Sequence, residues 1–336
     1  MKGLNLGRYV LSSGVVTVFL AGCGGIQTVG AVPQNVMTTS VTTPVGVRQP
    51  SGSYGDLLYV TTPTTTVLVS YPQGQVIGTI SGVSGLGGVC SDPNTGNVFA
   101  PQGATVLEYA HGGTTPIATL NGPAGYTDLQ GCSVDPNTGN LAMSSYFGPK
   151  GHSGLIIFPG GQGQPTVYTD KILHLFGYTA YDNAGNLFVT AFTNKGNYRI
   201  GELPAGQSKL VHIRVSPRSA EVGKIEWDGE YLAGNSTNER GQDSTIYRLR
   251  INGTKATVAG TVHLTSAGQS GFWIYDGLLF EAYGKVLHKK NMAIAAWSYP
   301  QGGKATSKFY GIVQGKHPTI YDVTMSVAPT HSRIPK

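Results

Sequence analysis

One hairpin sequence, repeated along the chain, restricts the fold more than any other feature. Residues 131–143 contain a short apolar run, the turn Asp-Pro-Asn-Thr-Gly-Asn and a second apolar run, and residues 88–99 repeat this pattern with the same turn. Shorter copies begin at Tyr181, Trp227 and Tyr275. Proline presets φ in such a turn, and Asn and Gly accept positive φ, so each copy predicts two antiparallel strands joined by a tight connection.

The copies are evenly spaced. Their turn aspartates stand 43, 47, 46 and 48 residues apart, at Asp92, Asp135, Asp182, Asp228 and Asp276. A carboxylate at this place accepts backbone N–H bonds, so we expect these five residues to shape turns and not to act as catalytic acids. A period of this length, on units of strand and turn, is typical of a propeller blade or of another β repeat array.

The two ends of the chain carry complementary parts of the repeat. Residues 56–80 contain three strand patterns, and a four-stranded blade needs one more, innermost strand. A lone alternating strand at residues 322–328 supplies it, and joining the two ends removes two exposed sheet edges. We therefore predict an all-β fold over residues 53–330, a six-bladed β-propeller of four-stranded antiparallel blades whose first blade is closed by the C-terminal strand. Seven blades or an open array are the alternatives, and residues 331–336 form a tail.

Composition agrees with this fold and argues against one class of partner. The chain has 49 Gly among 336 residues and only 12% charged residues, which suits an all-β protein with many tight turns. Its formal charge of +6 is spread along the sequence, with Lys289 and Lys290 as the one adjacent basic pair. We expect no nucleic-acid partner, because no basic stripe is present.

The first residues have the pattern of an export signal. Lys2 and Arg8 give a basic start, and residues 9–20 form an apolar core that is short for a membrane span. The Leu-Ala-Gly-Cys that ends at Cys23 resembles the bacterial lipobox. This resemblance implies a lipoprotein signal peptide at residues 1–22, cleavage before Cys23 and acylation of that residue, with palmitate as a typical acyl group. An ordinary signal peptide with an incidental cysteine is the alternative.

Acylation would anchor the chain to a membrane, since buried acyl chains contribute about 0.8 kcal/mol per CH₂ group. Residues 23–52 are rich in Thr, Val, Gln, Gly and Pro without clean alternation, which predicts a flexible tether. Gly24 is not the Asp that retains lipoproteins in the inner membrane under the Gram-negative rule. We therefore expect a lipid-anchored protein of the bacterial cell envelope, at the outer membrane or periplasmic face more than at the inner membrane.

The hairpins with their Asp-(x)-Gly-Asn turns resemble those of NHL-type and gluconolactonase-like six-bladed propellers. The resemblance runs from about Gly55 to Pro329. It implies the fold but not an activity, because propellers carry many unrelated functions.

Two cysteines remain beyond the lipid site. Cys90 lies two residues before its turn aspartate and Cys132 lies three before its own, so their side chains point to opposite faces of their blades. Neighbouring blades meet with opposite faces, so both thiols can enter one gap between blades. In an exported protein we expect a Cys90–Cys132 disulfide, and two buried free thiols are the alternative.

Propellers place ligands on the face where loops lead into the innermost strands, which we call the axial face. The reactive side chains in these loops are few: Asp128, His174, Glu221 and His317. A gluconolactonase-like site would need a divalent cation with six or more oxygen ligands, and two carboxylates do not supply them, so we expect no metal and no other cofactor. A streptogramin-lyase-like site would need a histidine base, for which His174 and His317 are weak candidates.

Tyr126, Tyr178 and Trp273 stand in the same loops and offer stacking surfaces for a ligand. Rigid aromatic residues among small ones give contact area at little entropic cost. The sequence thus favours a binding or scaffold module for a protein, peptide or glycan partner on the axial face. The alternative is a hydrolase or lyase, which requires at least two of the four reactive side chains within about 3 Å of each other or of one bound atom.

Overall fold

A computed structural model describes residues 54–83, 88–237, 243–283, 291–314 and 319–329. The chain divides into two compact units, Met1–Arg48 and Gln49–Lys336, and every described residue belongs to the second. The signal peptide, Cys23, the tether, His317 and the tail therefore lie outside the described residues. Within the described part, no helix is long and apolar enough to cross a membrane.

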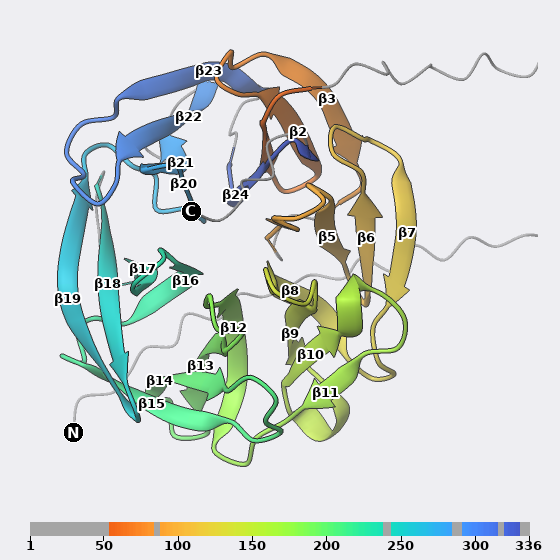
Figure 1. Cartoon of the computed structure of the whole chain (residues 1–336), viewed down its shortest axis with the longest axis vertical. Coiled ribbons are helices and arrows are strands. Elements are labelled where there is room, and N and C mark those ends of the chain that lie inside the picture. The colour runs from red at the N-terminus through yellow and green to blue at the C-terminus, as the bar shows by residue number, and fades with distance from the viewer. Residues whose placement is uncertain (1–53, 84–87, 238–242, 284–290, 315–318, 330–336) are drawn as a thin grey trace, which may run out of the picture. The chain divides into compact units, whose positions relative to one another are not determined.

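The described residues form an all-β structure whose strands pair into sheets (Figure 1). The first sheet has the order β24 (Asp322–Ser326), β1 (Leu57–Thr61), β2 (Thr65–Ser70), β3 (Val76–Ser81). The next has β4 (Cys90–Ser91), β5 (Val98–Gln102), β6 (Thr105–Tyr109), β7 (Pro116–Asn121). A third has β8 (Thr127–Val134), β9 (Leu141–Phe147), β10 (Gly154–Phe158), β11 (Thr166–Tyr168).

Two further units follow along the chain. One is β12 (Leu173–Tyr181), β13 (Leu187–Thr193), β14 (Tyr198–Leu203), β15 (Val211–Ser216). The other is β16 (Val222–Trp227), β17 (Leu232–Ser236), β18 (Ser244–Asn252), β19 (Lys255–Leu264). The last sheet is β20 (Trp273–Tyr275), β21 (Leu278–Tyr283), β22 (Asn291–Ser298), β23 (Ser307–Gln314).

The first and last strands of the chain are neighbours. β24 pairs antiparallel with β1, from Leu57 opposite Ser326 to Thr61 opposite Asp322. All five residues of each strand are buried. In β1 the side chains alternate, with Leu57 and Tyr59 in one apolar cluster and Leu58 and Val60 in another.

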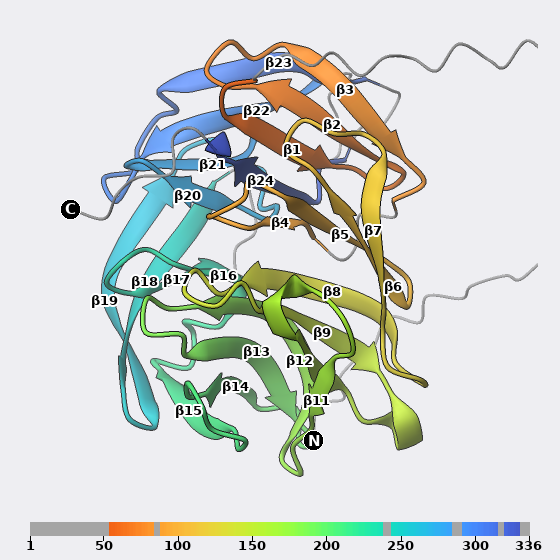
Figure 2. The ribbon, with the colours of Figure 1, turned by 45° about the vertical axis from the view of Figure 1, so that its right-hand side comes forward.

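The sequence predicts separate four-stranded blades, and one pair of neighbours departs from this prediction. β15 pairs in parallel with β19, from Arg214 opposite Lys255 to Ser216 opposite Thr257, and the two units merge into one eight-stranded sheet. The cause is the length of the β18–β19 hairpin, whose strands have 9 and 10 residues. Its tip extends past its own sheet and reaches β15, as Figures 1 and 2 both show.

The core consists of apolar clusters between adjacent units. Six clusters of buried side chains each combine residues from two four-stranded units. One of them packs Phe280 and Ile294 of the last sheet against Leu58, Val60 and Val323 of the first sheet. Inner strands such as β1, β13 and β24 are therefore buried on both faces, which explains their continuous apolar runs, whereas the outermost strands β3 and β7 are largely exposed.

Four of the five repeated turn aspartates have the structural role that the sequence predicts. Asp92, Asp135, Asp182 and Asp228 each accept the backbone N–H of the residue two positions later, at 2.8–3.0 Å. The asparagine two residues after the aspartate links neighbouring sheets in two of the turns. The Asn94 amide donates to the carbonyl of Pro136, and the Asn137 amide donates to the carbonyl of Asn183, both at 3.0 Å.

Cys90 on β4 and Cys132 on β8 are joined by a disulfide, with sulfur atoms 2.06 Å apart and Cα atoms 5.6 Å apart. Cys90 is buried in the apolar cluster between these two sheets. The two thiols thus enter one gap from opposite sides, as their different distances from the turn aspartates require.

Candidate functional site

The reactive side chains predicted on the axial face do not come together. Asp128 and His174 are exposed on β8 and β12, and Glu221 is half-buried just before β16. Among the described residues, no hydrogen bond or ion pair joins any two of these three side chains. That part of the chain also contains no group of three His, Cys, Asp or Glu side chains placed to hold a metal ion. The fourth candidate of the hydrolase or lyase alternative, His317, lies outside the described residues.

The three predicted stacking residues differ from one another. Tyr126 is 9% exposed and belongs to the core, so its assignment to a ligand surface is wrong. Its ring fills the space above Gly148 and Gly154, where an added Cβ would lie 2.3 and 2.4 Å from it. Tyr178 and Trp273 are half-buried and pack against the edges of two apolar clusters.

Exposed apolar side chains gather on the axial face instead. Seven large hydrophobic residues are exposed in the described chain, and four of them stand at this end of β9, β12 and β13: Phe147, Ile172, Leu175 and Phe192. We call these four residues the axial-face patch. Leu175 and Phe192 are cross-strand partners. Phe147 ends β9 and Ile172 immediately precedes β12, and these two strands are in contact across their two sheets.

A pair of histidines borders this patch. The rings of His152 and His174 meet edge to face, with centroids 5.5 Å apart. Ser153 fixes the backbone beside them, because its hydroxyl donates to the carbonyl of His174 at 2.8 Å and accepts the N–H of Phe176 at 3.0 Å. These contacts connect the β9–β10 loop with β12 and hold the neighbouring sheets together under the patch.

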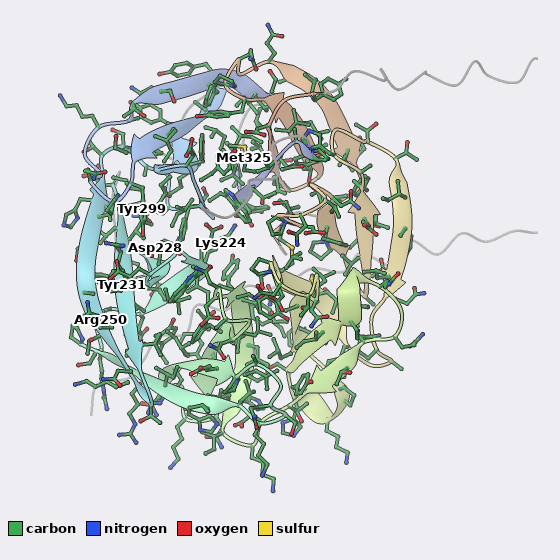
Figure 3. All side chains as sticks on the ribbon, viewed as in Figure 1. Lys224, Asp228, Tyr231, Arg250, Tyr299 and Met325 are labelled. Atoms are coloured by element: carbon green, nitrogen blue, oxygen red, sulfur yellow. A yellow bond between two sulfur atoms is a disulfide. The ribbon has the colours of Figure 1, made fainter. Side chains whose placement is uncertain are left out.

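A second group of polar residues lies buried among the innermost strands (Figure 3 labels its lysine). Lys224 on β16 donates to Asp322 Oδ1 on β24 at 2.6 Å, and its side chain is 7% exposed. Asp322 also accepts the N–H of Val89 at 3.3 Å. An added Cβ on Gly271 would lie 1.9 Å from Asp322 Oδ1, so glycine is required there. One carboxylate therefore contacts residues of four sheets or the loops that begin them.

Glu226 completes this axial cluster, which consists of Lys224, Glu226 and Asp322. Its Oε2 accepts the N–H of Ile274 at 2.8 Å, and its Oε1 lies 3.7 Å from Lys224 Nζ, beyond hydrogen-bond distance. Burial raises the pKa of Glu226 to about 8, although Lys224 opposes this shift. Burial also raises the pKa of Asp322, again opposed by Lys224. At neutral pH the Glu226 carboxyl thus keeps its proton beside an ion pair.

A cavity of about 200 Å³ adjoins this cluster and is lined by Lys224, Glu226 and Trp273. Its other walls come from the far ends of the innermost strands and the turns after them, including Ser91, Cys132, Ser133, Thr179 and Asn183. The cavity is therefore not on the loop side that the sequence indicates; of the predicted site residues only Trp273 and Cys132 line it. It can offer a ligand one ammonium group, one protonated carboxyl and an indole face, with Nζ 5.6 Å from the ring centroid.

Lys224, Glu226 and Asp322 were not among the predicted site residues, because the prediction considered loops and these three residues lie within strands. A signal was present: each is a charged residue inside an otherwise apolar strand pattern, next to the axis. A comparable ion pair forms at a turn, where Arg248 Nε lies 2.6 Å from Asp228 Oδ2 and the Tyr299 hydroxyl donates to the same oxygen (Figure 3). Burial alone would raise the pKa of Asp228, but these two hydrogen bonds lower it.

Comparisons with known proteins support the fold. No model of a known protein family matches the chain, and no curated protein matches its sequence. Several solved structures are similar. One is a protein of unknown function from Bacteroides caccae, with 12% identity and a TM-score of 0.57, and 81% of this chain matches 99% of its length. TolB from Acinetobacter baumannii has 12% identity and a TM-score of 0.56, and 82% of this chain matches 67% of its length.

The Swd1 β-propeller domain of Myceliophteria thermophila is similar in the same way. Its identity is 10% and its TM-score 0.53, with 82% of this chain matching 87% of that domain. At such low identity these likenesses concern the fold alone. The chain folds as a β-propeller of four-stranded antiparallel units.

Proposed function

We propose that the protein is a binding module that holds a protein or peptide partner on its axial-face patch. The observation that carries the proposal is the concentration of exposed apolar side chains there: Phe147 is 61% exposed, Ile172 51% and Phe192 39%. Contiguous exposed apolar residues on a rigid scaffold are typical of interaction surfaces. Phe, Ile and Leu side chains offer no hydrogen bonds to sugar hydroxyls, so a protein or peptide suits this patch better than a glycan.

The experiment compares two variants of the full chain in cross-linked pull-downs from cells that naturally contain the protein. In the first, Phe147→Ser and Phe192→Ser remove the aromatic part of the patch. The matched control, Val76→Ser with Ile117→Ser, removes two apolar residues that are 49% and 58% exposed on the outermost strands β3 and β7. We expect wild type and control to capture the same partner and the patch variant to lose it, with unchanged stability.

Equal capture by the patch variant and the control would contradict the proposal, since general surface hydrophobicity would then explain the binding. The absence of any specific partner for the wild type would contradict it as well. Thermal unfolding of all three proteins shows that a lost partner is not a lost fold.

We further propose that the propeller has six blades and closes on itself, as in the NHL-type and gluconolactonase-like propellers that its hairpins resemble. The support is that six apolar clusters join successive units and that β24 pairs with β1. Removal of residues 319–336 tests the closure, because it deletes β24 and exposes the edge of β1. We expect the truncated chain to aggregate, and a soluble, cooperatively folding product would contradict closure.

The location of this module is also a proposal. The Leu-Ala-Gly-Cys sequence supports acylation of Cys23 and a lipid-anchored protein of the bacterial cell envelope. Labelling with an alkyne analogue of palmitate should mark the wild type and the Cys90→Ser/Cys132→Ser variant, and should not mark Cys23→Ser. Labelling of Cys23→Ser at the wild-type level would contradict the anchor.

A further inference from the structure

A row of basic side chains crosses the junction at which β15 and β19 merge two units into one sheet. Arg214 stands opposite Lys255 in the parallel β15–β19 pair. On the other side of β15, the β14–β15 register pairs Ile200 with Ile213, which brings Arg199 next to Arg214 one step further along. Three cations thus occupy adjacent positions on three neighbouring strands.

The three side chains share the outer face of the sheet. Their neighbours Ile200, Ile213 and Ala256 are fully buried in the apolar cluster beneath. Because side chains alternate along a strand, Arg199, Arg214 and Lys255 point away from that core. Arg214 and Lys255 are exposed and Arg199 is half-buried. We call these three residues the cationic row.

The row lies in a cleft and has no partner of opposite charge. The cleft has a volume of about 870 Å³, and Arg218 and His212 also line it. Glu221 is the one acidic residue among its described lining residues, and His212 is already held by Asp170 at 2.9 Å. Within the part of the chain that the structure describes, no carboxylate forms an ion pair with any side chain of the row.

Like charges directly opposite each other on neighbouring strands destabilise a sheet. Burial and the charges of Arg214 and Arg218 also lower the pKa of Arg199, so the cations are close enough to repel one another. An anion between them would remove this repulsion. Neighbouring strands are roughly 5 Å apart, so the row spans roughly 10 Å, which is wider than a single carboxylate.

We propose that this cleft binds a ligand that carries a diphosphate or two adjacent phosphate groups, with Arg199, Arg214 and Lys255 as its charge partners. Guanidinium groups match phosphate oxygens with paired N–H donors, and phosphates carry enough charge for several cations. The cleft has the volume of a small-molecule site, so it leaves room for an organic part beyond the phosphates. Ile172 of the axial-face patch also lines this cleft, so the two sites adjoin, but neither proposal depends on the other.

Calorimetric titration of the full chain with inorganic pyrophosphate tests this site. We expect saturable binding that Arg214→Gln weakens about tenfold or more, as expected for the loss of hydrogen bonds to a charged group. Lys255→Gln is a second variant of the row and should weaken binding in the same direction. The matched control is Arg250→Gln, because Arg250 lines a different pocket together with Asp182, Glu202 and Glu230.

Two results would overturn the proposal. One is no saturable binding of pyrophosphate to the wild type. The other is an equal loss of affinity in Arg214→Gln and Arg250→Gln, which would show general attraction to a basic protein. A parallel titration with geranyl diphosphate, a lipid that carries a diphosphate group, identifies the source of the phosphates. Tighter binding than that of pyrophosphate, again lost in Arg214→Gln, assigns the cleft to a lipid diphosphate, and weaker binding assigns it to a free diphosphate compound.

Discussion

The axial cluster and the cationic row gather charged side chains in opposite ways. At the axis, Lys224 lies 2.6 Å from Asp322, and the charges neutralise each other where water is excluded. At the junction of β15 and β19, the basic residues stand side by side without a carboxylate of the described chain to pair with them. Charges that are balanced within the chain hold sheets together, whereas charges left unbalanced on a surface are available to a ligand.

The two regions also differ in the cost of removing one charge. A buried ion that loses its partner remains in a medium that solvates it poorly, so its removal destabilises the fold strongly. An exposed ion that loses a like-charged neighbour loses a repulsion. Removing one member of the Lys224–Asp322 pair and removing one cation of the row should therefore change stability in opposite directions.

The largest effect is expected from Asp322→Ala. This change leaves Lys224 buried without its partner and removes a hydrogen-bond acceptor for Val89, so the free energy of unfolding should fall by about 4 kcal/mol. Urea unfolding followed by tryptophan fluorescence measures it. The double variant Lys224→Met/Asp322→Leu is the control, and it should recover a large part of the loss because no unpaired charge remains. A loss below about 1 kcal/mol in Asp322→Ala would show that the pair does not stabilise the fold.

Glu226→Gln is expected to have the next largest effect, and the effect depends on pH. The unfolded chain releases this proton near pH 4.5, and the folded protein keeps it until about pH 8. Between these values the folded state binds more protons, so the wild type loses stability as pH rises through this window. The variant should lack this pH-dependent loss, so its free energy of unfolding relative to the wild type should rise by about 3 kcal/mol between pH 5 and pH 8. Parallel pH profiles of both proteins would contradict the raised pKa.

The smallest effect is expected from Arg214→Gln without ligand. Removing the middle cation of the row relieves repulsion with Arg199 and Lys255, so the free energy of unfolding should rise by about 0.5 kcal/mol at low salt. The gain should shrink at high salt, because exposed charges are screened. Chemical unfolding at two salt concentrations measures both. A clear loss of stability would show that Arg214 has a structural role and would remove the contrast with the axial cluster.

Features that depend on a few consecutive residues could be predicted from the sequence. The hairpins, the turn aspartates and the strand parity of Cys90 and Cys132 are local properties, and the structure contains each of them. Tyr126 could not be placed in this way, because its burial depends on the space above Gly148, just after β9, and Gly154, at the start of β10.

The charged sites depend on register, which the sequence does not display. Arg199, Arg214 and Lys255 are distant in the chain and form no motif, and only the pairing of β14, β15 and β19 brings them together. Lys224 and Asp322 are further apart still, and their contact requires the C-terminal strand to lie beside the axis.

The pairing of β24 with β1 has a consequence for the order of events during synthesis. The ribosome produces Leu57–Thr61 long before Asp322–Ser326, so the first sheet can be completed only after β2 to β23 have been made. Until then β1 has an open edge, and Lys224 has no Asp322 to bind. A chain that stops before Asp322 lacks both the strand and the carboxylate, so its first sheet cannot form as in the complete fold.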